Sequence, residues 1–89
     1  MLWRVGLRVR ARRLILMENL NDRRRKLLGQ RIRMERVAAG HSQRSFAPIA
    51  GTNQSYLWEV ETGRVNASVD FLCRVADALG VKVADLIDF

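Results

Sequence analysis

Apolar residues recur every three or four positions along most of the chain, the spacing that places side chains on one face of an α-helix. The stretches with this pattern run from residue 22 to the C-terminus, and glycines at positions 40, 51, 63 and 80 separate them. Glycine commonly ends helices because it adopts a left-handed backbone without steric cost. The pattern therefore predicts an all-α domain of five helices over residues 22–89.

Short polar residues that can cap a helix precede four of these stretches. The candidate caps are Asn21 or Asp22, Ser42, Thr52 or Asn53, and Ser68, and the fifth helix is expected within KVADLIDF. The predicted core consists of Leu28, Ile32, Ala39, Phe46, Ala47, Ala50, Tyr56, Leu57, Val60, Val69, Leu72, Cys73, Ala76, Leu79, Val83, Leu86 and Ile87, with Val37 at its edge and Phe89 as a further candidate.

Residues 1–21 form a separate extension. Within WRVGLRVRA, apolar residues alternate with arginine or glycine, and this period of two predicts a strand. A single strand has no partner in the chain, so we expect a mobile segment unless a second copy pairs with it. Alternatively, the protein begins at Met17, and residues 1–16 are upstream sequence.

Positive charge is concentrated at the N-terminus. Residues 1–27 hold nine Lys/Arg against two Asp/Glu, which accounts for the whole net charge of +7, whereas residues 28–89 hold seven of each. A concentrated basic segment favours a polyanionic partner such as nucleic acid, although a solvated basic tail fits the same composition.

Composition also argues against several classes of protein. One cysteine and one histidine allow neither an internal disulfide nor a zinc site of ordinary spacing, and they suit a reducing, cytoplasmic location. No apolar run is long enough to span a membrane. Neither an acid–base pair nor a nucleophile motif nor a phosphate-binding loop is recognisable, so we expect no enzyme, no cofactor and no small-molecule ligand.

Pro48 falls where the second helix should be regular. If Ser42 is the cap, Pro48 is the sixth helical residue, and it removes one hydrogen bond to the Arg44 carbonyl. If Ser45 is the cap, Pro48 lies in the first turn, where proline is tolerated. We expect a kinked or partly 3₁₀ second helix and an unaffected third helix.

Four segments of residues 28–89 resemble the Cro/repressor-type helix-turn-helix domain, also called the xenobiotic-response-element family. These are LGQRIRMERVAAGHSQ, FA followed by AGTNQSYLWEVETG, NASVDFLCRVADALGV and ADLIDF, in the order and spacing of that family. The resemblance implies a five-helix, lambda-repressor-like bundle whose third helix, about residues 53–61, enters the DNA major groove by its N-terminal end.

The resemblance also assigns roles to individual residues. Base recognition falls to Asn53, Gln54, Ser55 and Glu59, since Gln and Asn can form two hydrogen bonds with adenine and Glu can accept one from cytosine. Phosphate contacts fall to Gln43, Arg44, Thr62, Arg64 and Asn66. Arg36 and Glu61 match a family ion pair that joins the first helix to the end of the third. The same polar residues also fit an ordinary solvated surface.

The sequence thus predicts a sequence-specific regulator that binds double-stranded DNA as a homodimer. An antitoxin-like protein-interaction module is the main alternative, because residues 28–89 carry no net charge and Glu59 lies among the predicted base contacts. A non-specific DNA-compacting protein is a third hypothesis. Tyr56 and Trp58 flank the inward Leu57, so both cannot be fully buried.

Overall fold

The computed structural model describes the backbone of residues 2–89 and the side chains of residues 11–89. The described chain is all-helical, which confirms the predicted fold class. Its five helices are α1 (Leu2–Ala38), α2 (Gln43–Ile49), α3 (Gln54–Glu61), α4 (Val69–Leu79) and α5 (Val83–Leu86).

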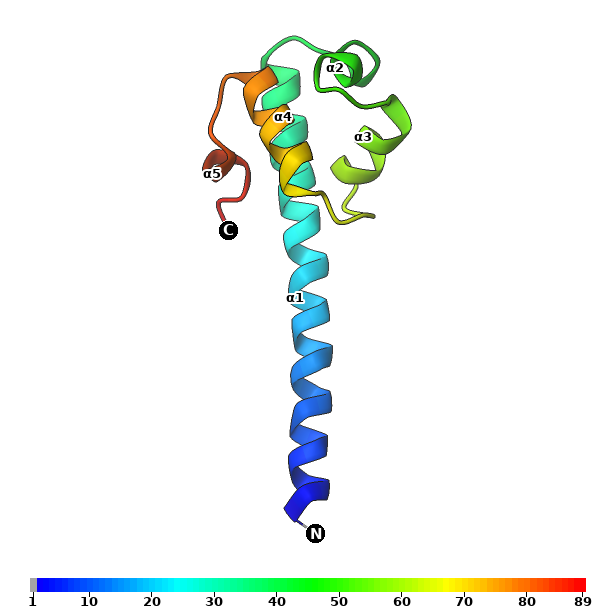
Figure 1. The fold of residues 1–89 in the computed structure, drawn as a ribbon, viewed down its shortest axis with the longest axis vertical. Helices are drawn as coiled ribbons and strands as arrows, with labels where there is room; N and C mark the ends of the chain where they lie inside the picture. Colours follow the sequence, from blue (N-terminus) through cyan, green and yellow to red (C-terminus); the bar gives the residue numbers. More distant parts are fainter. Residues whose placement is uncertain (1) are drawn as a thin grey trace.

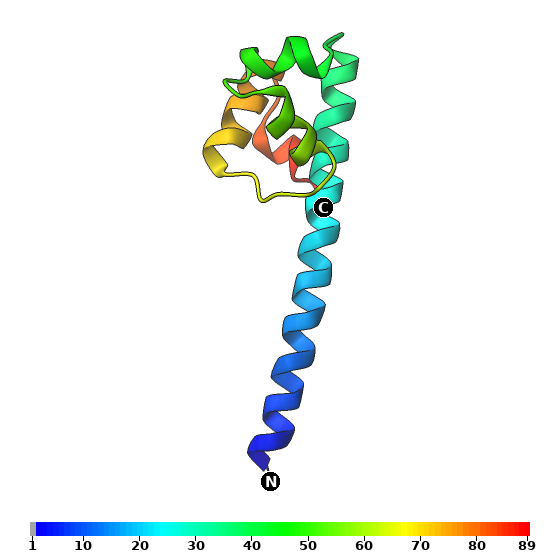
Figure 2. The same ribbon diagram turned by 90° about the vertical axis from the view of Figure 1, so that its right-hand side faces the viewer.

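Helix α1 dominates the shape of the molecule, which is 59 Å long and 23 × 19 Å across (Figure 1). Its 37 residues correspond to about 55 Å of helix. The C-terminal half of α1 packs against the other four helices, and its N-terminal half projects away from them (Figures 1 and 2). No helix in the described part of the chain combines the length and apolar character needed to cross a membrane.

The predicted strand in the N-terminal extension is wrong, and so is the predicted helix start at Asn21 or Asp22. Residues 2–20 belong to α1, so both candidate caps lie within the helix. A helix satisfies its backbone hydrogen bonds internally, whereas a lone strand cannot, and Arg, Leu and Met are good helix formers. The exposed Asp22 carboxylate instead pairs with Lys26 at 3.0 Å, and this hydrogen bond lowers the pKa of Asp22.

One core unites all five helices. Its buried apolar residues are Leu28, Ile32, Phe46, Ala47, Ala50, Leu57, Val60, Phe71, Leu72, Val75, Ala76 and Leu86. Helices α1 and α3 are in contact within this core, as are α2 and α3. The core therefore fixes the position of α3 relative to α1.

The predicted inward face of α4 is rotated from the observed one. Val69 is 72% exposed and Cys73 is exposed, so neither is a core residue. Phe71 and Val75 point inward instead, and Tyr56 packs edge-on against Phe71 with ring centroids 5.0 Å apart. Both faces have helical spacing, and the observed face buries the aromatic ring, which carries more apolar area.

Four predicted core residues at helix ends are also exposed. Helix α1 ends at Ala38, so Ala39 lies in the following turn, and Val37 in the last turn of α1 is 59% exposed. Helix α5 ends at Leu86, which is 1% exposed and fills the core at that point, while Ile87 is 42% and Phe89 56% exposed.

Helix α2 accommodates its proline. Ser42 is the N-cap, and its Oγ accepts a hydrogen bond from the Ser45 backbone N–H at 3.0 Å, so the alternative cap at Ser45 is wrong. The expected 3₁₀ portion is absent, since α2 is α-helical from Gln43 to Ile49. Pro48 and Arg44 are both exposed, so water can satisfy the Arg44 carbonyl that lacks its helical donor.

Candidate nucleic-acid interface

A four-residue turn, Ala50 to Asn53, joins α2 to α3. Gly51 has a φ of 68°, and its N–H donates to the Pro48 carbonyl while the Thr52 N–H donates to the Ala47 carbonyl. These two bonds form a Schellman motif, which needs a left-handed residue at this place. The turn therefore directs the start of α3 out of the core.

The first turn of α3 presents free polar side chains. Asn53 is the N-cap, and its Oδ1 accepts from the Tyr56 backbone N–H at 2.8 Å. Gln54 and Ser55 are exposed, and their side chains form no hydrogen bond within residues 11–89. Gln54 and Ser55 can therefore contact a ligand at no cost to the fold, whereas the Asn53 amide oxygen is already engaged in one hydrogen bond and keeps its N–H groups and one lone pair free.

A buried ion pair holds the C-terminal end of α3 on α1. Arg36 donates from Nε to Glu61 Oε2 at 2.7 Å and from Nη2 to Glu61 Oε1 at 2.9 Å. Arg36 Nη1 also donates to the His41 carbonyl at 2.7 Å, and Gln43 Nε2 donates to Glu61 Oε1 at 3.0 Å. We call Arg36, His41, Gln43 and Glu61 the buried network. It joins α1, α2 and α3 at one point.

Gly29 allows α1 and α3 to approach closely. A Cβ at this position would collide with the backbone carbonyl oxygens of Val60 and Glu61. A glycine in mid-helix normally lowers stability relative to alanine. Here it lets the end of α3 rest directly on the backbone of α1, beside the buried network.

Two adjoining depressions lie over the exposed side of α3. The first is lined by Gln43, Gln54, Ser55, Trp58 and Glu59, and the second by Arg33, Arg36, Gln43, Trp58, Glu61 and Thr62. They share Gln43 and Trp58, so they form one continuous surface over α1, α2 and α3. We call its seven outer residues the recognition surface: Arg33, Gln43, Gln54, Ser55, Trp58, Glu59 and Thr62.

Comparison with known proteins identifies this arrangement. The family model described as a helix-turn-helix domain matches residues 27–88. The chain is also 35% identical over 66 residues to the control protein C.BamHI of Bacillus amyloliquefaciens, covering 73% of this chain and 82% of that protein. The chain belongs to the Cro/repressor-type helix-turn-helix family.

Further relatives support the same family. The chain is 38% identical over 63 residues to the transcriptional regulator SinR of Bacillus subtilis, covering 70% of this chain and 57% of that protein. The crystal structure of the restriction-modification controller protein C.AhdI from Aeromonas hydrophila superposes with a TM-score of 0.68 at 35% identity, over 70% of this chain and 94% of that one. The crystal structure of the clp gene regulator ClgR from Corynebacterium glutamicum superposes with a TM-score of 0.69 at 36% identity. The match covers 72% of this chain and 82% of that one. These are regulators and not enzymes.

Trp58 and Arg33 are members of the recognition surface outside the predicted set of DNA-contacting residues. For Trp58, a DNA contact was one of three alternatives, beside a position at the core edge and a dimer contact, and Arg33 had no predicted role. Trp58 is 44% exposed, and the Arg64 guanidinium lies over its ring at 4.7 Å from the centroid. Arg33 is exposed one helical turn before Arg36, so the spacing of the predicted ion pair already placed Arg33 near the end of α3. The three-residue spacing between Arg33 and Arg36 was thus the sequence signal that could have identified Arg33 as a site residue.

The predicted phosphate-contacting residues are spread over several places. Arg44 is exposed at the start of α2. The Thr62 hydroxyl donates to the Trp58 carbonyl at 2.8 Å and so caps the end of α3. Asn66 lies elsewhere, in a groove bordered by α1 and Phe89. The structure therefore brings Gln43 and Thr62 together with the predicted base-contacting residues, but not Asn66.

Proposed function

We propose that this regulator binds a specific sequence of double-stranded DNA by inserting α3 into the major groove. The observation that carries the proposal is the exposed first turn of α3, where Gln54 and Ser55 have unengaged side chains on a helix fixed by the buried network. An amide with a free carbonyl and free N–H groups can form two hydrogen bonds with adenine. Glu59 lines the same depression and is suited to a cytosine amino group.

Phosphate contacts would flank this central region. Arg44 in the first turn of α2 and Arg64 just after α3 are exposed cations, and Arg33 on α1 adds a third. Stacking on Trp58 restricts the Arg64 guanidinium, which lowers the entropy lost when it binds an anion. Thr62 and Asn66 are weaker candidates, because the Thr62 hydroxyl is already engaged and the Asn66 side chain lies in a separate groove.

In this proposal residues 22–89 form the DNA-binding domain, and residues 1–21 form a basic extension whose mobility in solution stays a prediction. The protein would act in the cytoplasm of a bacterium or on phage DNA. It would act as a homodimer, since two recognition helices read two half-sites about one helical turn apart. The exposed Ile87 and Phe89 supply apolar surface near the C-terminus for self-association.

Selection of bound duplexes from a random pool tests the function directly. We expect the full chain to enrich two related half-sites, and Gln54→Ala to lose preference at one position of each half-site at a cost of about 1–3 kcal/mol. Gln30→Ala is the matched control, because Gln30 is an exposed helical glutamine outside the recognition surface. No enrichment by the full chain would refute the proposal.

A protein-interaction module is the second candidate. It is favoured by the balanced charge of residues 28–89, seven of each sign, which gives little general attraction to DNA. The two candidates differ in salt dependence, since only a DNA-binding protein loses duplex affinity steeply as salt rises.

A further inference from the structure

Helix α1 carries an apolar face that the domain does not cover. Its exposed residues are Leu16, Leu20, Leu27, Met34 and Val37, which are 61%, 47%, 37%, 62% and 59% exposed. We call these five residues the outer stripe. At 3.6 residues per turn they form one stripe that points away from the buried Leu28 and Ile32. In Figure 2, helices α2–α5 all lie to one side of α1, and its other side is bare.

The outer stripe has the spacing of a coiled-coil seam. In a heptad register with Leu20 at an a position, Leu27 and Met34 are also a residues, and Leu16 and Val37 are d residues. The seam covers residues 16–37, about 32 Å of helix. Arg23 and Gln30 occupy the remaining d positions. A face of this kind is suited to an α-helix laid alongside it.

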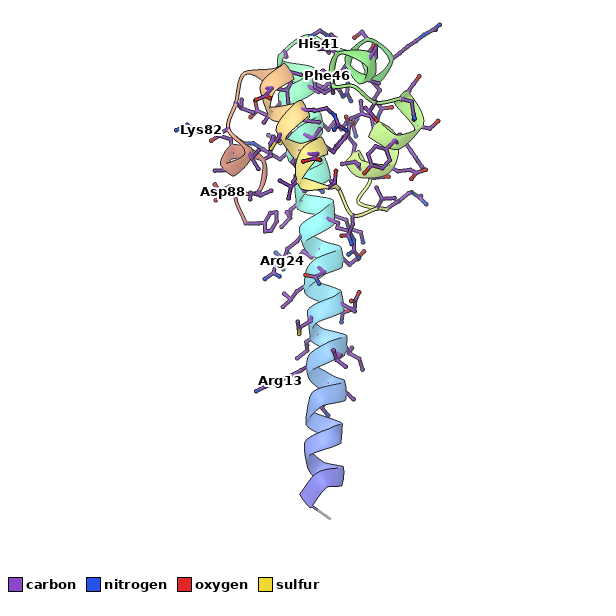
Figure 3. All side chains as sticks on the ribbon, viewed as in Figure 1. Arg13, Arg24, His41, Phe46, Lys82 and Asp88 are labelled. Carbon is purple, nitrogen blue, oxygen red and sulfur yellow. The ribbon has the colours of Figure 1, made fainter. Side chains whose placement is uncertain are left out.

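The residues that flank the stripe determine which helix can bind. The e and g positions carry Arg12, Arg24, Lys26, Arg31 and Arg33, and no acidic residue. Lys26 pairs with Asp22 at 3.0 Å and Arg31 with Glu35 at 3.1 Å on α1 itself. The other three form no ion pair within residues 11–89. In Figure 3, Arg24 extends outward from α1.

These charges disfavour a second copy of the chain as the occupant. In a parallel pair, Lys26 would face Arg31 of the other copy, and in an antiparallel pair every charged residue at the flanks would be a cation. In a parallel pair, Arg23 would also lie in the seam beside Arg23 of the other copy. Like charges at these positions are a recognised means of excluding a partner.

We infer that the outer stripe of α1 docks an amphipathic helix of a different protein, with apolar a and d residues and acidic e and g residues. The acidic flanks would pair with Arg12, Arg24 and Arg33. An acidic residue opposite Arg23 would neutralise the one charge that lies within the seam. This surface lies outside the recognition surface except for Arg33. The inference therefore does not depend on the proposed DNA function.

The test uses the full chain and two synthetic three-heptad peptides with Leu at a and d. One peptide has Glu at every e and g position, and the other has Lys. We expect the Glu peptide to bind at least tenfold more tightly than the Lys peptide in fluorescence titrations. The triple variant Leu20→Ala, Leu27→Ala, Met34→Ala should lose at least tenfold in affinity for the Glu peptide, while alanine preserves the helix.

The matched control is Leu14→Ala with Ile15→Ala, which removes apolar side chains that are at least as exposed from other faces of α1. It should bind the Glu peptide within about twofold of the parent. A charge-reversed variant, Arg12→Glu with Arg24→Glu, should lose the preference for the Glu peptide. Circular dichroism melting verifies that every variant is folded.

Three outcomes would overturn the inference. The first is equal binding of the Glu and Lys peptides. The second is self-association of the full chain that the triple variant abolishes, which would assign the stripe to a second copy. The third is binding to phosphatidylserine vesicles, abolished in the triple variant, without binding to the Glu peptide, which would assign the stripe to a membrane surface.

Discussion

Replacing Glu61 by Gln should destabilise the domain severely. The substitution keeps the size of the side chain but removes the charge opposite Arg36, and both residues are only 6% exposed. A glutamine can still accept at one oxygen, but its NH₂ group cannot accept from the Arg36 Nε that now donates at 2.7 Å. The guanidinium would remain buried without a counter-charge.

Breaking a buried pair in this way costs about 3–5 kcal/mol, against a total stability of about 5–15 kcal/mol for a domain. At roughly 4 °C or more per kcal/mol for a domain of this size, the melting temperature should fall by at least about 12 °C. Thermal and urea unfolding followed by circular dichroism measure both quantities. Glu35→Gln is the control, because it breaks a surface i,i+4 pair with Arg31 and should cost about 0.3–0.5 kcal/mol.

A double substitution shows whether the loss of stability comes from burying an unpaired charge or from reduced packing. Arg36→Met with Glu61→Leu removes both charges, so no unpaired ion is left, and this variant should be more stable than Glu61→Gln alone. Gln43 and the His41 carbonyl lose a partner in the double variant, so it should not fully regain parental stability. If the free energy of unfolding of Glu61→Gln lies within about 1 kcal/mol of that of the parent, the buried network is not what holds α3 on α1.

Three other variants test different parts of the structure. Arg64→Ala should weaken binding to all duplexes and reduce the slope of log affinity against log salt by about one, whereas Lys82→Ala, on the side away from α3 (Figure 3), should leave the slope unchanged. Gly29→Ala should cost about 1–3 kcal/mol in urea unfolding, because its Cβ collides with two backbone carbonyls of α3; equal or higher stability would contradict this packing. Deleting residues 1–16 removes five arginines. The deletion should reduce the slope of log affinity against log salt by about 0.9 for each phosphate that the shortened chain no longer neutralises, and it should leave the preferred DNA sequence unchanged. An identical slope excludes the extension from the DNA interface.

The helices from α2 to α4 could be predicted because their starts depend on local hydrogen bonds. Ser42, Asn53 and Ser68 each accept from a backbone N–H three residues later, so sequence spacing alone identifies them. The inward face of α4 could not be predicted in the same way. Two faces of α4 have helical periodicity, and the choice between Phe71 and Cys73 depends on which neighbours pack against it.

The length of α1 shows a second limit of the sequence pattern. Alternation of apolar and basic residues before Ala11 fits a strand, but a strand needs a neighbour that the chain does not supply. Of the predicted site residues, Gln54, Ser55 and Glu59 share one depression with Gln43. The engagement of the Thr62 hydroxyl at the C-terminal end of α3 could not be predicted, because it depends on which backbone carbonyl the hydroxyl reaches in the folded turn.

Gln43 connects the stability of the domain to its proposed contact with DNA. Its Nε2 carries two hydrogens, and one is donated to Glu61 Oε1 at 3.0 Å. The second hydrogen is available to a phosphate oxygen, so one amide could bridge the DNA backbone and the ion pair that holds α3. A phosphate bound there would favour the orientation of α3 that the network already holds. In this arrangement the network positions α3 before DNA arrives, which reduces the ordering cost of binding.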